Sequence, residues 1–395
     1  MTTSVFPAVT TAGADALLAT YTRAPVSFVD GHGVYLVDAD GKRYLDFVSG
    51  IAVNALGYGD PALRDALHSA ADGLIHVSNL YATEPCERLA ATLVQKSFAD
   101  KVFFCNSGAE ANEGAFKFAR RWAGSHGEAK HRIVALRGSF HGRLFGTLAA
   151  TDRPAYGAPF RPLAGGFSIV ERDIGDLDAA LSADTAAAVI FEPIQGEGGV
   201  RVLDHGFVRE VRALTKERGA ALIFDEIQCG LGRTGTAFAY EQLGVVPDIL
   251  TLAKPIAGGL PMGAILVSGE IATAIKPGDH GSTFGGGPFV ASVANHVVER
   301  LTDPALLQHV TENGAWFGEQ LREVADRSGR IRAVRGVGYM WGIDVMGMAA
   351  HVVSEALSAG LLICSAGEYT VRLLPPLVAT RDELARGLAI LEEVL

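Results

Sequence analysis

The sequence contains few cysteines, no long apolar run and no excess of positive charge. Among its 395 residues are four cysteines, and none of them forms a CxxC pair. Scattered thiols of this kind favour reduced, mostly buried side chains over disulfide bonds or a zinc site. The eleven histidines show no spacing that indicates a metal site either. We therefore expect neither a disulfide framework nor a bound metal.

The shortage of long apolar runs and of basic charge also excludes classes of partner. The run 186–191 is far shorter than the ~18 apolar residues that cross a membrane, so a membrane protein is not expected. A net charge of −10 disfavours a nucleic-acid partner, because phosphate binding needs a basic surface. No basic residue precedes Arg23, so neither a secretory signal nor a transit peptide is predicted. We expect a cytoplasmic protein with neither a membrane nor a nucleic-acid partner.

What is present is an alternation of apolar runs with helical patterns. Several runs are continuously apolar, as in strands buried on both faces, and between them residues such as Ala115, Phe118 and Trp122 repeat with helical spacing. Strands that alternate with helices predict an α/β sheet. The predicted strands are 102–104, 132–136, 187–191, 221–224, 248–252 and 264–267.

Local signals mark the flanks of this region. The segment 34–47 predicts a hairpin, because β-prone residues flank the turn sequence at 38–41. Asp60 and Pro61 are typical of a helix start, and Gly219 is typical of a helix end. After about residue 290 the pattern changes to helices and short strands, which indicates a second lobe.

Two charged residues stand at the ends of predicted strands. Lys254 ends the run 248–254, and Pro255 after it favours an extended backbone at the lysine. A lysine in apolar surroundings has a lowered pKa and becomes a usable nucleophile, although most lysines at strand ends are simply solvated. Asp225 follows another strand at its carboxyl end, where ligands bind in open α/β sheets. A lone aspartate there is more often a helix cap or a surface turn. The indication of a ligand site therefore depends on Asp225 and Lys254 together.

Two turns next to strands offer further ligand groups. The turn 105–110 leads into a helix, so its backbone N–H groups, with Ser107 as an additional donor, suit a phosphate. The tetrapeptide 140–143 follows a strand and brings a ring, Phe140, and a cation, Arg143. Each turn has a plain alternative: a capped strand-to-helix turn for the first, and a loop with a core aromatic residue for the second.

Taken in order, these segments resemble the class III (ω-amino acid) aminotransferases, and most closely their acetylornithine aminotransferase branch. An amine, an anion, a phosphate cradle and an aromatic plate are the groups that a pyridoxal 5′-phosphate (PLP) enzyme needs. The likeness runs from about Tyr21 to the C-terminus. It rests on FCNSGAEANE at 104–113, EPIQGEGG at 192–199 and FDEIQCGLGRTG at 224–235, with further matches at 46–54, 140–143, 252–255, 281–285 and 371–376.

The resemblance implies an α/β fold of the fold-type I PLP-dependent transferases. This architecture has a large domain with a mostly parallel seven-stranded sheet and a smaller α+β domain. We expect the large PLP-binding domain at 61–289, and a small domain built from an N-terminal segment, 1–60, and a C-terminal part, 290–395. The resemblance also implies a homodimer whose active sites are shared between the subunits.

Roles for individual residues follow from the same resemblance. Lys254 binds the cofactor as a Schiff base and shuttles the proton between the substrate carbon and the cofactor. Asp225 pairs with the pyridinium nitrogen, and Gln228 contacts the phenolic oxygen. The other cofactor contacts are Ser107, Gly108 and Ala109 at the phosphate, Phe140 on the ring, and Thr283 at the phosphate of the partner subunit's cofactor.

The substrate contacts that the resemblance implies involve two arginines. Arg143 clamps the carboxylate remote from the reacting amine, a task that suits a planar guanidinium. Arg372 binds the α-carboxylate of glutamate, and it pairs with Glu197 when the other substrate presents an uncharged chain. Ser282 lies beside Thr283 and is a further candidate for substrate contact. Three positions depart from the usual pattern: Tyr58 replaces a common His, Ala82 a frequent aromatic residue, and Gly287 the usual Asn.

The implied function is transfer of the δ-amino group of N2-acetyl-L-ornithine to 2-oxoglutarate in arginine biosynthesis, giving N-acetyl-L-glutamate 5-semialdehyde and L-glutamate. Succinylornithine, acetyl-lysine, N-succinyldiaminopimelate, ornithine and 4-aminobutyrate stay open as amine donors. A PLP aminomutase, which needs no 2-oxoglutarate, and a PLP-binding regulator are two further classes. Glu197 with Arg372 favours the transferase over the aminomutase, and the intact lysine, aspartate and arginine set disfavours the regulator.

Overall fold

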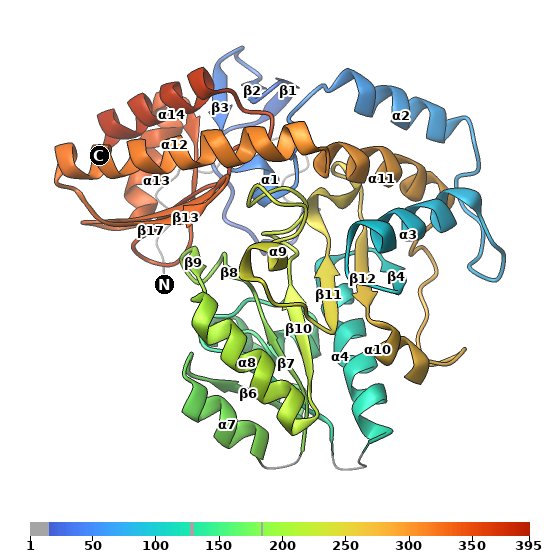
Figure 1. Cartoon of the computed structure of the whole chain (residues 1–395). Helices are drawn as coiled ribbons and strands as arrows, with labels where there is room; N and C mark the ends of the chain where they lie inside the picture. Colours follow the sequence, from blue (N-terminus) through green and yellow to red (C-terminus); the bar gives the residue numbers. More distant parts are fainter. Residues whose placement is uncertain (1–15, 127–129, 183–184) are drawn as a thin grey trace.

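The computed structural model describes residues 16–126, 130–182 and 185–395 (Figure 1). Within these ranges lies a seven-stranded sheet of order β4-β12-β11-β10-β7-β5-β6. β12 is antiparallel to both of its neighbours, and the other strands run parallel to one another. The expected α/β fold with a mostly parallel sheet is therefore confirmed. The strands are β4 Lys101–Cys105, β5 Arg132–Leu136, β6 Phe167–Val170, β7 Ala186–Phe191, β10 Ala221–Asp225, β11 Ile249–Leu252 and β12 Gly263–Val267.

The degree of burial explains why most of these strands are predictable from the sequence and why β6 is not. Every residue of β7 and β10 is buried, so both faces of the sheet are covered and the strands become continuous apolar runs. β6 is not predicted, although it is present. It lies at the edge of the sheet, its four residues are only half-buried, and Ser168 interrupts its apolar run.

Helices pack over this sheet, and several begin or end at the predicted residues. α4 (Gly108–Gly124) lies against β7, β11 and β12, and α8 (His205–Arg218) lies against β10. Gly219 ends α8 with a left-handed φ of 59°, and Asp60 caps α2, as predicted. The other helices in this part are α2 Pro61–Ala71, α3 Glu84–Lys96, α5 Phe145–Ala149, α6 Pro154–Gly157, α7 Ile174–Ser182, α9 Tyr240–Leu243, α10 Gly269–Ala274 and α11 Pro288–Leu301.

The two ends of the chain build two smaller four-stranded sheets, of orders β1-β2-β3-β15 and β13-β14-β17-β16. β3 (Arg43–Asp46) forms the predicted hairpin with β2 (Tyr35–Asp38) and runs parallel to β15 (Leu361–Leu362). Residues near both termini therefore share one sheet. The remaining elements here are β1 Phe28–His32, β13 Ile331–Val337, β14 Met340–Val345, β16 Cys364–Ser365, β17 Thr370–Leu373, α12 Pro304–Ser328, α13 Ala349–Ala359 and α14 Arg381–Val394.

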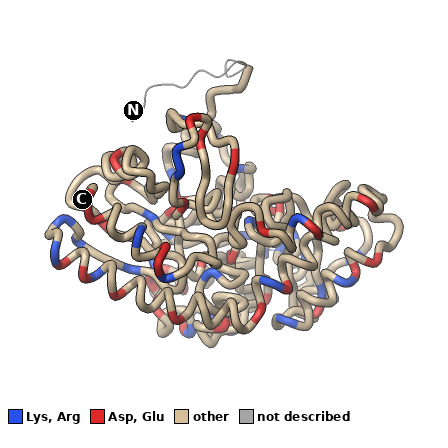
Figure 2. Tube along the Cα trace, turned by 90° about the horizontal axis from the view of Figure 1, so that it is seen from above, with Lys and Arg blue, Asp and Glu red and all other residues tan. Residues whose placement is uncertain are grey.

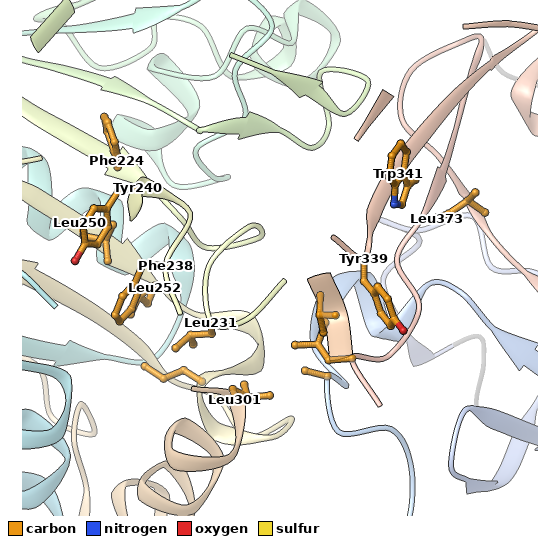
Figure 3. Packing of buried hydrophobic residues seen from close by; sticks show 14 of the residues in the cluster. Phe224, Leu231, Phe238, Tyr240, Leu250, Leu252, Leu301, Tyr339, Trp341 and Leu373 are labelled. Carbon is orange, nitrogen blue, oxygen red and sulfur yellow. The ribbon is translucent and has the colours of Figure 1, made fainter. Parts of the chain in front are cut away.

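The sheet β1-β2-β3-β15 contains strands from both ends of the chain, as a small domain built from both ends requires. α11 packs against α2 and α3 and so stays with the large sheet, whereas α12 packs against β13 and α14. We keep the division into 1–60, 61–289 and 290–395 as a proposal, and its last boundary falls inside α11. One apolar cluster joins the two parts, with Phe224 and Leu250 on the large sheet and Trp341 and Leu373 on a small one. Figure 3 shows these side chains on their separate ribbons.

Two features of the described residues concern membranes and surface charge. In the described ranges no helix is long and apolar enough to span a bilayer. Figure 2 shows Lys and Arg positions interleaved with Asp and Glu positions along the helices, so attraction of an anion depends on particular side chains. The segment before Arg23, on which the expected absence of a leader depends, lies largely outside the described residues, which begin at residue 16.

Candidate active site

A cavity of about 400 Å³ lies at the carboxyl ends of the parallel strands. Asp225 is the last residue of β10, Glu192 follows β7 directly, and the turn 106–109 follows β4. The carboxyl ends of parallel strands meet at one edge of a sheet, which brings these residues together. The predicted site residues that line the cavity are Ser107, Gly108, Ala109, Phe140, Arg143, Asp225, Gln228 and Lys254.

Lys254 enters the cavity from the short turn η3 (Lys254–Ala257), which follows β11. Its φ is 41°, so the extended backbone that we expect from Pro255 is wrong. A following proline disfavours the right-handed helical region, and the left-handed region stays open at a cost that functional sites often bear. Among the described residues the amine has no hydrogen-bond or ion-pair partner. Burial lowers the pKa of Lys254, although the charge of Asp225 opposes this shift.

Asp225 is held at the cavity wall by three donors. Its Oδ2 accepts from Asn112 Nδ2 at 2.7 Å and lies 2.7 Å from His141 Nδ1, and its Oδ1 accepts from the Ile227 N–H at 3.1 Å. Thr251 Oγ1 donates in turn to Asn112 Oδ1 at 2.8 Å. A carboxylate can only accept, so these donors fix its orientation. The result is a buried anion whose position does not depend on solvent.

The groups that support Asp225 have no role among the predictions from the sequence. Asn112 and His141 lie inside the matched stretches 104–113 and 140–143, so their positions are available as a signal. Their partner lies in a distant stretch, however, and only the fold brings them together. Glu192 is a further case: burial raises its pKa to about 7, with His141 opposing and Asp225 adding to the shift. It accepts from the backbone N–H groups of Phe140 and Gly196.

The turn before α4 has the geometry of an anion site. Ser107 caps the helix, with its Oγ accepting from the Glu110 N–H at 3.2 Å, and Gly108 and Ala109 form the first turn. N–H groups of a first turn have no partners within the helix and favour a phosphate. A Cβ at residue 108 would lie 2.8 Å from Ile227 Cδ1, so a side chain there would fill the cradle.

Behind Gln228 lies an ion pair between Arg372 and Glu197, with 2.6 Å between Nη1 and Oε1. Gln228 Oε1 accepts from the same guanidinium at 3.1 Å. Arg372 is 1% exposed, whereas the Glu197 side chain keeps 23% of its accessibility. Burial by itself would lower the pKa of Arg372, but Cys364 and Glu197 raise it above its ordinary value. The structure thus brings this pair next to a residue of the cavity wall.

Ser282 and Thr283 are not among the residues that line this cavity. They lie at a separate depression of about 750 Å³, together with residues 76–80 and 102–104. Ser282 approaches the cavity indirectly, since its Oγ accepts from Asn106 Nδ2 at 3.3 Å and Asn106 lines the cavity. Within one chain Thr283 is therefore absent from the wall of the cavity that holds the phosphate turn.

The groups around the cavity fit pyridoxal phosphate. Lys254 supplies an unpartnered amine, Asp225 a fixed anion, and the start of α4 a phosphate cradle. Phe140 supplies an aromatic ring at the wall. The four groups come from separate strand ends of one sheet, and a single cavity contains them all.

Comparisons with known proteins agree with this geometry. The profile of the family Aminotransferase class-III matches residues 18–395. An acetylornithine aminotransferase from Methanocaldococcus jannaschii is 44% identical over 376 residues, which cover 95% of this chain and 94% of that protein. The crystal structure of N-acetylornithine aminotransferase from Stenotrophomonas maltophilia has a TM-score of 0.83 at 38% identity, covering 93% of this chain and 95% of that one. The ornithine aminotransferase from Toxoplasma gondii has a TM-score of 0.93 at 30% identity, covering 97% and 93%.

Proposed function

The chain belongs to the class-III aminotransferases, and from this premise we propose that it transfers the δ-amino group of N2-acetyl-L-ornithine to 2-oxoglutarate. The products are N-acetyl-L-glutamate 5-semialdehyde and L-glutamate, as in arginine biosynthesis. One observation carries the proposal: an exposed arginine, Arg143, lines the cavity, and an ion-paired arginine, Arg372, donates to Gln228 in the cavity wall. Relatives named acetylornithine aminotransferase, 43–44% identical over nearly the whole chain, support it.

Class-III aminotransferases use pyridoxal 5′-phosphate, which when bound withdraws electrons from the substrate carbon and carries the amino group between substrates. We propose that Lys254 holds this cofactor through its amine and moves the proton at the amine-bearing substrate carbon. Its lowered pKa serves both tasks, because a neutral amine is a nucleophile and a base. Asp225 faces the pyridine nitrogen, and Gln228 the phenolic oxygen. The remaining contacts are those of Ser107, Gly108 and Ala109 with the phosphate and of Phe140 with the ring.

Substrate recognition in this proposal uses the two arginines in turn. Arg143 binds the carboxylate remote from the reacting amine through its planar set of N–H donors. When N2-acetylornithine is bound, its uncharged chain lies near Arg372, and Glu197 keeps that cation paired. When glutamate is bound, its α-carboxylate replaces Glu197 on Arg372. One cavity thereby serves both half-reactions.

A panel of amine donors assayed with 2-oxoglutarate tests the proposed substrate, with glutamate formation as the readout. The panel contains N2-acetylornithine, succinylornithine, acetyl-lysine, N-succinyldiaminopimelate, ornithine and 4-aminobutyrate. The proposal is supported if kcat/KM is highest for N2-acetylornithine. If kcat/KM is higher for another donor, that donor replaces N2-acetylornithine as the assigned substrate. Repeated turnover of a donor without 2-oxoglutarate, beyond the one equivalent per site that a single half-reaction consumes, would instead indicate an aminomutase.

We also propose a homodimer whose active sites are shared. Thr283 does not line the cavity of its own chain and borders a depression next to exposed apolar side chains. Exposed patches of this kind mark protein contacts. In a dimer Thr283 would reach the phosphate of the partner subunit's cofactor, and Ser282 the substrate. The exposed side chains are Leu74, Ile75, Leu80, Tyr81 and Phe284.

Sedimentation velocity and subunit mixing test the shared site. Subunits with Lys254→Ala are mixed with subunits carrying Thr283→Ala, and cofactor affinity is measured. A mixed dimer has one site with both residues intact, so half of the sites should regain the cofactor affinity of the unsubstituted protein. Mixed dimers that bind no better than the Thr283→Ala parent would contradict sharing. The cytoplasmic location stays a prediction.

A further inference from the structure

Arg143 is held in an unusual way for a charged side chain that lines the cavity. Its Cζ lies 3.5 Å from the centroid of the Tyr156 ring and 5.8 Å from that of Phe140. In the described part of the chain it has no hydrogen-bond or ion-pair partner. A ring covers only the face of a guanidinium, so the N–H donors at its edge stay free for a planar acid.

Tyr156 itself is firmly placed. It belongs to the short helix α6, and its backbone N–H donates to the Arg153 carbonyl at 2.9 Å. Its ring meets Phe140 edge to face, with 6.4 Å between the centroids and an interplanar angle of 87°. Phe140 lines the cavity, so Tyr156 lies directly behind the cavity wall. The ring that Arg143 contacts is therefore fixed relative to the cofactor position.

The segment that leads into Tyr156 is also tied to the residues just before Phe140 and to the segment that contains Glu197. Asp152 Oδ2 accepts from the Gly138 N–H at 2.8 Å, and Asp152 N–H donates to the Ser139 carbonyl at 3.0 Å. The guanidinium of Arg153 donates to the backbone carbonyl of Glu197, whose side chain pairs with Arg372. One short segment thus contacts the surroundings of both arginines.

We propose that Tyr156 is a positioning residue that sets where Arg143 meets the remote carboxylate, and that it thereby makes the site selective for substrates with an acid group at that distance. This inference rests on the proposed function, in which Arg143 binds that carboxylate. A free arginine side chain loses rotamer freedom when it binds an acid. A ring that already holds the guanidinium lowers this cost, and the free edge donors then bind without a rearrangement.

The first test measures equilibrium binding without turnover. The affinity of the holoenzyme for glutarate, a five-carbon dicarboxylate with no amine or ketone, is measured by calorimetry in Tyr156→Leu and in the matched control Tyr156→Phe. Loss of a partly solvated cation–π contact should weaken glutarate binding about fivefold in Tyr156→Leu. Tyr156→Phe keeps the ring and should bind glutarate as the parent does. Should the leucine variant lose its cofactor, Tyr156→Met takes its place with the same expectation.

The second test measures selectivity as a ratio, which cancels any general change in the cofactor site. N2-acetylornithine is compared with N-acetyl-1,4-diaminobutane, the same amide without the carboxylate. The ratio of their kcat/KM values should decrease about fivefold in Tyr156→Leu and stay constant in Tyr156→Phe. In an Arg143→Gln background the Tyr156→Leu change should have no further effect on glutarate affinity, because Tyr156 acts through Arg143.

These measurements separate the inference from the proposed function. If N2-acetylornithine is a poor donor but glutarate affinity changes as expected, the substrate assignment fails and the role of Tyr156 stands. Unchanged glutarate affinity in Tyr156→Leu, an equal loss in Tyr156→Phe, or a full additional loss in the Arg143→Gln background would each overturn the inference.

Discussion

Two arginines at the cavity are held in opposite ways, and we call the surroundings of the buried Arg372 the inner side and those of the exposed Arg143 the open side. Arg372 on the inner side is 1% exposed, pairs with Glu197 at 2.6 Å and donates to Gln228. Arg143 on the open side is exposed, stacks on Tyr156 and has no polar partner within the described ranges. A buried charge needs a partner, so a carboxylate on Arg372 must replace one that is already there. Solvent satisfies Arg143, so an acid can bind it directly.

The two arginines therefore provide two separate properties, which are the choice between substrates and the binding of the carboxylate that both substrates share. One arginine could not provide both. A pair that must open before a substrate carboxylate can bind distinguishes glutamate from a donor with an uncharged chain. A stacked, open guanidinium binds the remote carboxylate that both substrates share. We expect changes on the inner side to alter the choice between substrates, and changes on the open side to alter the strength of binding.

The largest expected effect comes from removing the amine of Lys254, on which the reaction of both substrates depends. Lys254→Ala should lose the visible absorption of the lysine-bound cofactor and at least about 10³-fold in turnover, because nucleophile and proton carrier disappear together. Absorbance and steady-state rates measure this. Both arginines remain, so glutarate binding should persist. Lys216→Ala, which removes an exposed lysine on α8, is the matched control, and normal activity in Lys254→Ala would refute the assignment.

The second effect concerns a buried carboxyl group near the inner side. Burial raises the pKa of Glu192 from 4.5 to about 7, so the folded protein retains a proton that the unfolded chain releases between these values. The contribution of Glu192 to the free energy of unfolding is therefore full below the unfolded pKa. It should decrease by on the order of 3 kcal/mol as the pH rises through the folded pKa, between about pH 5 and 8.

Denaturant unfolding at both pH values, in the parent and in Glu192→Gln, measures this contribution. Glu192→Gln removes the titrating proton and should flatten the decrease in stability with pH. Glu210→Gln, an exposed position on α8, should leave the pH dependence unchanged. Equal pH slopes in the parent and in Glu192→Gln would show that the pKa of Glu192 is not raised.

The third effect tests the inner pair directly. Glu197→Ala leaves Arg372 unpaired when the acylated donor is bound, but not when glutamate supplies its own carboxylate. Breaking a fully buried pair costs about 3–5 kcal/mol, and the partial exposure of Glu197 should reduce the change in discrimination to about 1–2 kcal/mol. The ratio of acetylornithine to glutamate reactivity should therefore move about tenfold towards glutamate in single-turnover measurements. If both rates decrease by the same factor, Glu197 is a general support and not a switch.

The smallest effect comes from salt on the open side. Arg143 is exposed, so mobile ions should screen its attraction for a carboxylate. Raising the ionic strength from about 0.05 to 0.5 M should increase the KM for N2-acetylornithine by about twofold. N-acetyl-1,4-diaminobutane has no carboxylate for Arg143 and should show little dependence. A salt response that persists in Arg143→Gln would have to arise elsewhere.

The three departures from the family pattern lie away from the cavity. The Tyr58 hydroxyl donates to Asp46 Oδ2 at 2.6 Å and accepts from Asn54 Nδ2 at 3.1 Å, so it has a structural role of its own. Gly287 precedes α11 and caps it without a side chain. Ala82 is exposed on the segment before α3, where the missing aromatic ring predicts a roomier side for the acyl group.

Several features were predictable because their signals are local. Continuous apolar runs predict most strands of the large sheet, and Asp60 and Gly219 predict helix ends, since caps depend on one or two residues. Lys254 and Asp225 were found at strand ends, and parallel strands place such ends at one edge. Their roles, like those of the other site residues, came from the resemblance and stay proposals.

By itself the sequence determined the alternation of strands and helices, the strand ends that carry the lysine and the aspartate, and the family. Only the tertiary structure decided the hydrogen bonds of Asn112 and His141 to Asp225, the ring of Tyr156 under Arg143, and the left-handed backbone of Lys254. Periodicity and capping are read within one turn or one strand. The hydrogen bonds to Asp225 join residues that are distant in the chain. The contact of Arg143 with Tyr156 and the backbone of Lys254 depend on how neighbouring segments pack. No local sequence pattern records either kind of feature.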